Sequence, residues 1–354
     1  MQLRTEQLDA HLARGLRNLY TVHGDEPLLA QEVGDALRAA ARAAGYAERK
    51  VYTVSGAHFD WSSVLGAAQA MSLFAERQLI EIRIPSGKPG KEGSEALQRY
   101  CESLSDDVMT IVQLPRLDFQ QTKAAWFTAL DSAGVVLRVE PVERNALPAW
   151  IGQRLARQGQ RVAPGEAGQQ TLAFFADRVE GNLLAAHQEL QKLALLYPAG
   201  ELSFEQVQDA VLDVARYDVF KLGEAVLGGQ VARALRMLDG LRAEGEAAVL
   251  VHWTLSDDIR ALARLRAAVD DGKPVPLALR EARLWGAKER LFERVLPKLS
   301  RQQVQELVEA ASICDGLVKG LRHPDWPEDA WAALRRLVLM MLQASGRTRL
   351  ALAA

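Results

Sequence analysis

The first residues to examine for chemistry are those that follow the first predicted strand, where many nucleotide-hydrolysing proteins bind phosphate. Such a loop has the pattern GxxxxGK followed by Ser or Thr, because backbone amides and a lysine surround the phosphates. Here the strand predicted over residues 19–23 is followed by Gly24, Asp25, Glu26 and Pro27. The loop contains one glycine and no lysine, and its two carboxylates would repel phosphate. We instead expect Asp25 to cap a helix that begins near Pro27.

Two further elements of ATP hydrolysis are missing from the sequence. A metal-binding acidic pair is expected at the end of a core strand, yet the strand predicted at 109–114 is followed only by a lone Asp118, which fits a cap or turn residue. In ring ATPases a second, helical segment usually places an arginine shortly after a glycine, whereas Leu183 and Leu184 follow Gly181 here. Three separate absences therefore argue against ATP hydrolysis.

No other catalytic, metal or cofactor site is predicted. The six histidines form no HxxxH pair, and no GxSxG nucleophile motif occurs. The two cysteines, Cys101 and Cys314, match no metal-ligand spacing. The chemistry of this chain is therefore expected to be binding, without a catalytic site of its own.

The most unusual binding candidate is the run Gln69-Ala70-Met71-Ser72-Leu73-Phe74. It ends a helical pattern predicted over residues 61–71, whose apolar spacing already supplies one core-facing stripe. Two interpretations are open at this point. All three large apolar side chains belong to the core, or at least one of Leu73 and Phe74 projects as an anchor for a partner. A buried Leu or Phe side chain contributes about 1.5 to 3 kcal/mol.

The elements that position this run alternate between strands and helices. Strands are predicted at 19–23, 51–55, 78–84, 109–114 and 135–139, and helices at 27–44, 61–71, 92–104 and 123–132. This alternation predicts a mostly parallel sheet with helices on both faces, in an ATPase-like but degenerate α/β domain over residues 1–140.

After residue 140 the strand pattern disappears and the chain is predicted to be helical. Helices at 148–157, 165–180, 183–197 and 203–212 form a small lid domain over 141–212, and Ser203 with Gln206 matches a capping box. A larger all-α domain is predicted over 213–343, followed by a tail at 344–354 that frays.

Composition limits the contacts with nucleic acid. The chain has 354 residues, 49% hydrophobic and 25% charged, and a net charge of −2, so a DNA contact would have to be a local patch. Basic residues gather in the predicted larger all-α domain, where Arg283 and Lys288 flank Trp285. They form either a solvated helix face or a phosphate-facing patch, and Trp285 either stacks on a base or is buried.

The N-terminal segment carries charges throughout and has no apolar leader region. No stretch approaches the about 18 uninterrupted apolar residues of a membrane helix. We expect a cytoplasmic protein without membrane contact.

Three stretches carry a resemblance over nearly the whole chain, to about residue 340: the run at 69–74, AAWFTAL at 124–130 and EGNLLA at 180–185. On these stretches the chain resembles the delta subunits of the bacterial DNA polymerase III clamp loader. The resemblance implies a non-hydrolysing, AAA+-like subunit of the DNA polymerase III holoenzyme, in a five-subunit ring with gamma or tau and delta prime subunits. It also implies that the all-α domain over 213–343 is a collar domain that joins the subunit to its neighbours. The ring would act on primed DNA during replication.

The resemblance also implies a role for the apolar run. Leu73 and Phe74 would form a hydrophobic plug that binds the sliding clamp, the beta subunit, and opens one clamp interface. Met71 would lie adjacent to the plug, and Gln69 and Ser72 would shape the exposed turn. Two alternatives remain: an ATP-hydrolysing subunit of the ring, and a stator subunit of the same complex without the plug.

Overall fold

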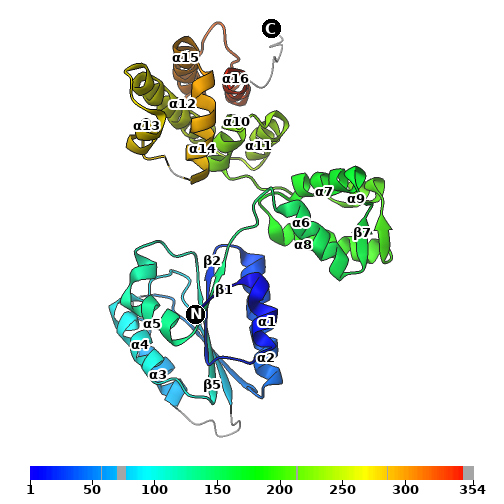
Figure 1. Cartoon of the computed structure of the whole chain (residues 1–354), viewed down its shortest axis with the longest axis vertical. Coiled ribbons are helices and arrows are strands. Elements are labelled where there is room, and N and C mark those ends of the chain that lie inside the picture. The colour runs from blue at the N-terminus through cyan, green and yellow to red at the C-terminus, as the bar shows by residue number, and fades with distance from the viewer. Residues whose placement is uncertain (57, 70–76, 213, 285, 346–354) are drawn as a thin grey trace. The chain divides into compact units, whose positions relative to one another are not determined.

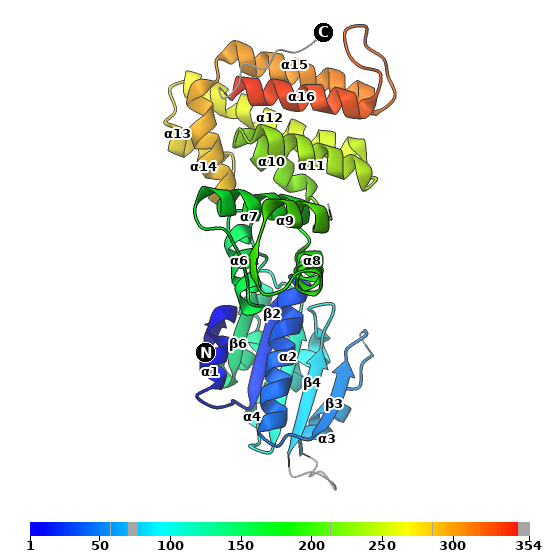
Figure 2. The same ribbon diagram turned by 90° about the vertical axis from the view of Figure 1, so that its right-hand side faces the viewer.

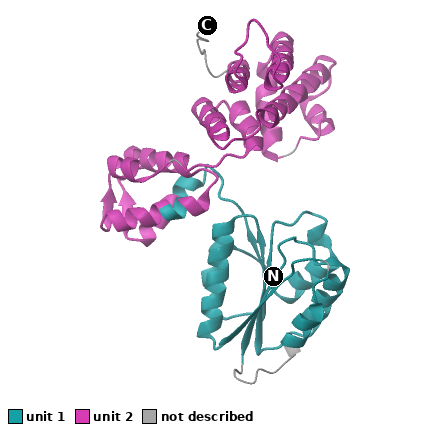
Figure 3. Ribbon diagram, turned by 180° about the vertical axis from the view of Figure 1, so that it is seen from behind, with its two compact units in different colours: residues 1–150, 186–188 teal, residues 151–185, 189–354 magenta. Residues whose placement is uncertain are grey.

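A computed structural model of the chain describes all residues except 57, 70–76, 213, 285 and 346–354 (Figure 1). The described residues form two compact units, one of residues 1–150 and 186–188 and one of residues 151–185 and 189–354 (Figure 3). The three-domain division expected from the sequence, with boundaries at 140, 212 and 343, stays a prediction.

The first unit is built around six parallel strands in the order β1-β6-β2-β5-β4-β3. This confirms the predicted parallel sheet. The strands are β1 Gln2–Arg4, β2 Leu19–Gly24, β3 Glu48–Thr53, β4 Gln78–Arg83, β5 Val108–Leu114 and β6 Val135–Val139. β1 was not expected, and β3 begins three residues before its predicted start at residue 51.

Helices cover both faces of this sheet (Figure 1). The helices are α1 Leu8–Leu12, α2 Pro27–Ala43, α3 Trp61–Gln69, α4 Gly90–Glu102 and α5 Ala125–Ala133. One face carries α1 and α2, whose apolar side chains pack with Tyr20 and Ile111 of the strands. The other carries α3, α4 and α5, which pack with Ile80 and Val112. Because β2, β4 and β5 are buried almost throughout, their near-continuous apolar runs suit a sheet covered on both sides.

Beyond β6 the chain is mainly helical, as predicted. The prediction that no strand follows residue 140 was wrong. Two three-residue strands, β7 and β8, pair in parallel, and the capping box at Ser203 and Gln206 is confirmed. The elements are α6 Leu147–Arg157, β7 Gln160–Val162, α7 Glu166–Val179, α8 Leu183–Leu196, β8 Gly200–Leu202, α9 Phe204–Ala210, α10 Val219–Leu227, α11 Val231–Ala243, α12 Ala248–Asp270, α13 Val275–Glu281, α14 Gly286–Val295, α15 Arg301–Val318 and α16 Ala330–Ala344.

The helices α10, α11, α12, α15 and α16 enclose the largest apolar core of the second unit. Its fully buried members include Leu222, Leu255, Cys314 and Leu337. None of the helices in the described part of the chain is long and apolar enough to span a membrane.

Candidate functional site

The loop after β2 turns sharply against β6. Gly24 has φ 152°, and a Cβ there would lie 1.9 Å from the carbonyl oxygen of Val139, so only glycine fits. α2 begins at Pro27, as expected, but the capping residue is Glu26, whose carboxylate accepts a hydrogen bond from the amide of Leu28 at 3.3 Å. The expectation that Asp25 is the cap was therefore wrong. The Asp25 carboxylate instead lies 3.6 Å from the Arg116 guanidinium.

The carboxyl ends of β4 and β5 lie at the same edge of the sheet as this loop, because the strands are parallel. No Asp or Glu occurs in residues 83–86 after β4 or in residues 113–117 after β5. Asp118 is a turn residue, as expected: its Oδ1 accepts a hydrogen bond from the amide of Gln121 at 2.7 Å. The ends of β4 and β5 therefore supply no acidic pair that could hold a metal beside a phosphate.

The turn between α7 and α8 also differs from a nucleotide site. Gly181 has φ 75°, and a Cβ there would lie 1.8 Å from the carbonyl oxygen of Arg216. Asn182 caps α8 by accepting from the amide of Ala185 at 3.2 Å. Leu183, at the position where an arginine was sought, is buried. The motif at 180–185 therefore forms a tight helix-capping turn with an apolar anchor.

The predicted clamp-binding run lies almost wholly outside the described residues. Gln69 is the last residue of α3, and Met71, Ser72, Leu73 and Phe74 fall in the segment 70–76 that is not described. The site assignment drawn from the resemblance stays a prediction. The structure does describe the residues that flank this segment.

The described residues on either side of the segment 70–76 make specific contacts. After the segment, the side-chain amide of Gln78, which is 2% exposed, donates to the carbonyl oxygen of Ala67 in the last turn of α3, at 2.7 Å. The neighbouring Arg77 donates to the carbonyl oxygen of Ala44 at 3.0 Å, and its guanidinium lies 5.5 Å from the centre of the Tyr46 ring. These contacts bring the end of α3 and the start of β4 together.

Helix α3 itself is fixed on the sheet by the apolar stripe that the sequence indicated. Trp61 and Val64 are buried, and the Trp61 ring packs edge-on against Phe59 with ring centres 5.1 Å apart. α4 approaches closely, since a Cβ at Gly93 would lie 2.5 Å from the Trp61 ring. The segment 70–76 therefore follows a helix whose apolar face is packed against the sheet and α4.

The three residues considered for DNA contact are not brought together as a described patch. Trp285 lies outside the described residues, and Arg283 occupies a left-handed turn with φ 55°. The Lys288 ammonium on α14 lies 2.5 Å from the carboxylate of Asp258 on α12, which is 1% exposed. Burial raises the pKa of Asp258, and Lys288 opposes this rise. Lys288 thus has a partner that competes with phosphate.

A buried carboxylate in the sheet was not expected from the sequence. The Glu81 side chain in β4 is fully buried and receives three arginines: its carboxylate lies 3.4 Å from Arg38, 2.7 Å from Arg49 and 3.0 Å from Arg83. Burial alone would raise the pKa of Glu81, but hydrogen bonds from Arg49 and Arg83 and the charge of Arg38 lower it overall. The available signal was a single charge inside the apolar run Leu79-Ile80-Glu81-Ile82.

Comparison with known proteins agrees with the resemblance. The family model described as "DNA polymerase III, delta subunit" matches residues 20–140. The chain is 33% identical over 341 residues to the DNA polymerase III subunit delta of Escherichia coli, covering 96% of both chains. It is 28% identical over 343 residues to the subunit of the same name from Haemophilus influenzae, covering 94% of this chain and 96% of that protein.

Among solved structures, the Bacillus subtilis DNA clamp loader delta protein has a similar fold. The TM-score is 0.50 at 15% identity, covering 96% of this chain and 99% of that chain. At this identity the match concerns the fold alone. The sequence relatives decide the family: over nearly its whole length, this chain belongs to the DNA polymerase III delta subunit family.

Proposed function

We propose that this clamp-loader delta subunit binds the sliding clamp through Leu73 and Phe74 and holds one clamp interface open. The observation that carries the proposal is the 33% identity over 96% of both chains to a DNA polymerase III delta subunit. The apolar run at 69–74 adds chemistry suited to the task, because interface energy concentrates in a few apolar anchors.

The attachment of the segment 70–76 supports this role. An element that pulls on a partner must be anchored in its own domain, and both flanks of the segment are hydrogen-bonded to neighbouring elements. Shifting a clamp interface from 1:99 to 99:1 open requires about 5.5 kcal/mol of differential affinity. Two apolar anchors supply about 3 to 6 kcal/mol in total. We therefore expect a second clamp contact from the same unit.

We propose further that the chain does not hydrolyse ATP. The acidic loop at Asp25 and Glu26, the strand ends without an acidic pair and the buried Leu183 support this reading. ATP hydrolysis would then belong to the partner subunits, for which gamma or tau and delta prime are proposed, with primed DNA as the shared substrate of the assembled ring.

The test is a pull-down of the cognate clamp with the full chain and with the double variant Leu73→Ala plus Phe74→Ala. We expect the double variant to lose clamp binding by about a hundredfold or more, since each of the two side chains contributes more than about 1.4 kcal/mol and each 1.4 kcal/mol is a factor of about ten. The matched control is Leu195→Ala plus Leu196→Ala, which removes two exposed leucines of α8. If the first variant binds the clamp as tightly as the wild type, the plug assignment is wrong.

A second measurement separates clamp opening from clamp binding. The isolated chain should release clamps from circular DNA without nucleotide, because the opening energy comes from binding alone. Release that requires ATP would contradict the proposed opening mechanism even if clamp binding is confirmed.

A further inference from the structure

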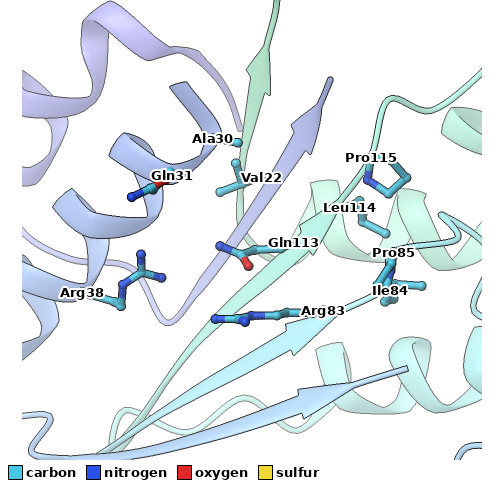
Figure 4. Close-up of a pocket in the computed structure, with 10 residues that line it drawn as sticks. All are labelled: Val22, Ala30, Gln31, Arg38, Arg83, Ile84, Pro85, Gln113, Leu114 and Pro115. Carbon is cyan, nitrogen blue, oxygen red and sulfur yellow. The ribbon is translucent and has the colours of Figure 1, made fainter. Parts of the chain in front are cut away.

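A pocket lies between α2 and the sheet in the first unit (Figure 4). Its volume is about 380 Å³, within the range of about 300 to 1,000 Å³ that is typical of small-molecule sites. It opens at the carboxyl ends of β4 and β5, where ligands commonly bind in parallel sheets. The pocket exists because α2 leaves part of this face uncovered: Figure 2 shows β3 and β4 beside α2.

Four polar side chains and an apolar wall line this pocket. Gln31 and Arg38 come from α2, Arg83 from β4 and Gln113 from β5, and Figure 4 shows Arg38 facing Gln113 and Arg83 across the pocket. The apolar wall consists of Val22, Ala30, Ile84, Pro85, Leu114 and Pro115. A ligand that matches this lining has both a polar group and an apolar body.

The charge around the pocket favours an anion. Arg38, Arg49 and Arg83 surround the single buried carboxylate of Glu81, and Arg38 has one further partner, Asp35, at 2.7 Å. Three guanidinium groups thus face two carboxylates. No acidic residue lines the pocket itself. Arginine is also the side chain best shaped to bind carboxylate and phosphate in a bidentate manner.

Some polar side-chain groups at the pocket wall make no hydrogen bond within the described part of the protein. Within the described part of the chain, the side-chain amides of Gln31 and Gln113 have no protein partner, and the buried Nε of Arg83 has none either. Gly34 on α2 makes room for these groups, since a Cβ there would lie 3.1 Å from the Arg38 guanidinium and from the Gln113 amide nitrogen.

We propose that this pocket binds a small amphiphilic anion of up to about mononucleotide size, with a phosphate or carboxylate held by Arg38 and Arg83. Gln31 and Gln113 bind further polar atoms, and the apolar wall covers the body of the ligand. A small molecule fits better than an acidic side chain of a partner protein, because a carboxylate alone leaves the apolar wall uncovered. This binding site goes beyond the proposed clamp function and does not depend on it.

The test is isothermal titration of the full chain with four probes: dAMP, benzoate, inorganic phosphate and adenosine. dAMP and benzoate carry an anionic group and a planar body, and they distinguish a phosphate from a carboxylate ligand. We expect saturable binding of at least one of them. Phosphate lacks the planar ring that would contact the apolar wall, and adenosine lacks the charge that would bind the arginines. Each should therefore bind at least about tenfold more weakly.

Two variants locate the binding. Gln113→Glu keeps the shape of the side chain but places a carboxylate beside Arg38 and Arg83, which should weaken binding by at least about tenfold. Gly34→Ala favours the helix but places a methyl group 3.1 Å from the Arg38 guanidinium and the Gln113 amide, so that both side chains must shift, which should weaken binding several-fold without loss of folding. Gln169→Glu changes the net charge equally at an exposed position of α7 and should leave binding unchanged.

Three results would overturn the proposal. The first is that neither dAMP nor benzoate binds saturably to the wild type. The second is that Gln113→Glu and Gly34→Ala bind the probe as well as the wild type, which would place the ligand elsewhere. The third is that no probe binds while Gln113→Glu weakens assembly with partner subunits, which would assign the pocket to a protein carboxylate.

Discussion

The side-chain amide of Gln78, the first residue of β4, donates to the carbonyl oxygen of Ala67 in the last turn of α3, at 2.7 Å. This bond joins the two elements that flank the segment 70–76. It is buried, so water does not compete for it. The arrangement means that a force on the proposed clamp-binding segment is passed to the sheet and to α3 together.

Gln78→Met should therefore weaken clamp binding although Gln78 is not proposed to touch the clamp. The variant keeps the side-chain length but removes the buried hydrogen bond to the Ala67 carbonyl, which costs about 0.5 to 1.5 kcal/mol of unfolding free energy. Clamp affinity is measured by surface plasmon resonance, and stability by urea unfolding. Gln98→Met is the control, because Gln98 donates to the Ser94 carbonyl within α4 at 2.9 Å. Equal clamp affinity of both variants would refute the anchoring role.

Glu81→Gln should destabilise the first unit at neutral pH by about 3 kcal/mol or more, because three arginines lose their buried charged partner. The folded-state pKa of Glu81 lies below its ordinary 4.5, so its stabilisation is fully present above pH 4.5 and is lost as the pH falls through the lower, folded-state value. The variant should lose this part of the acid dependence.

Denaturant unfolding between about pH 3.5 and 7, followed by circular dichroism, measures this effect. Glu95→Gln, at an exposed position of α4, serves as the control and should keep the wild-type profile. If Glu81→Gln loses stability with falling pH in the same way as the wild type, Glu81 does not remain ionised in the folded protein.

His252 should make the helical core of the second unit sensitive to mild acid. Its Nε2 lies 2.8 Å from the Ala311 carbonyl oxygen and 2.8 Å from the Ser256 hydroxyl. Burial lowers the pKa of His252, although the Ala311 carbonyl and Asp315 oppose this. Stability is therefore full above the unfolded pKa of 6.5 and falls as the pH drops towards the folded value, by up to about 1.4 kcal/mol per pH unit.

The expected result is that His252→Gln flattens this pH dependence for amides of α12, measured by native-state hydrogen exchange. His58→Gln, at an exposed position, should not change it. Burial also lowers the pKa values of His11 and His23, but these lie in the first unit. A wild-type slope that survives in His252→Gln would assign the effect to another group.

Gly181→Ala and Gly245→Ala form a matched pair that separates backbone strain from steric clash. Their φ angles are 75° and 77°. Each alanine must therefore adopt a left-handed conformation, which lowers the free energy of unfolding by about 1 to 2 kcal/mol. Nothing lies within 4 Å of a Cβ at Gly245, whereas a Cβ at Gly181 meets the Arg216 carbonyl at 1.8 Å. We expect Gly181→Ala to cost at least about 1 kcal/mol more in urea unfolding. Equal losses would show that the turn at 181 relaxes freely.

Several elements of the fold follow from local pattern. α2, α4 and α5 begin and end within two residues of their predicted bounds, because each has a continuous apolar stripe at helical spacing. By contrast β1, β7 and β8 are only three residues long, and their strand conformation depends on pairing with a distant partner. Short strands of this kind leave no periodic signal. The edge strand β3 likewise takes its register from pairing with β4.

For function, the sequence by itself determined the absence of the nucleotide motifs and the apolar run at 69–74, because both depend on residues adjacent in the chain. Only the tertiary structure decided that Glu26 and not Asp25 caps α2, since capping depends on backbone angles at the turn. It also decided the arginine cluster around Glu81: Arg38 and Glu81 are 43 positions apart and come from a helix and a strand. Their meeting depends on α2 packing across the sheet, which no local spacing encodes.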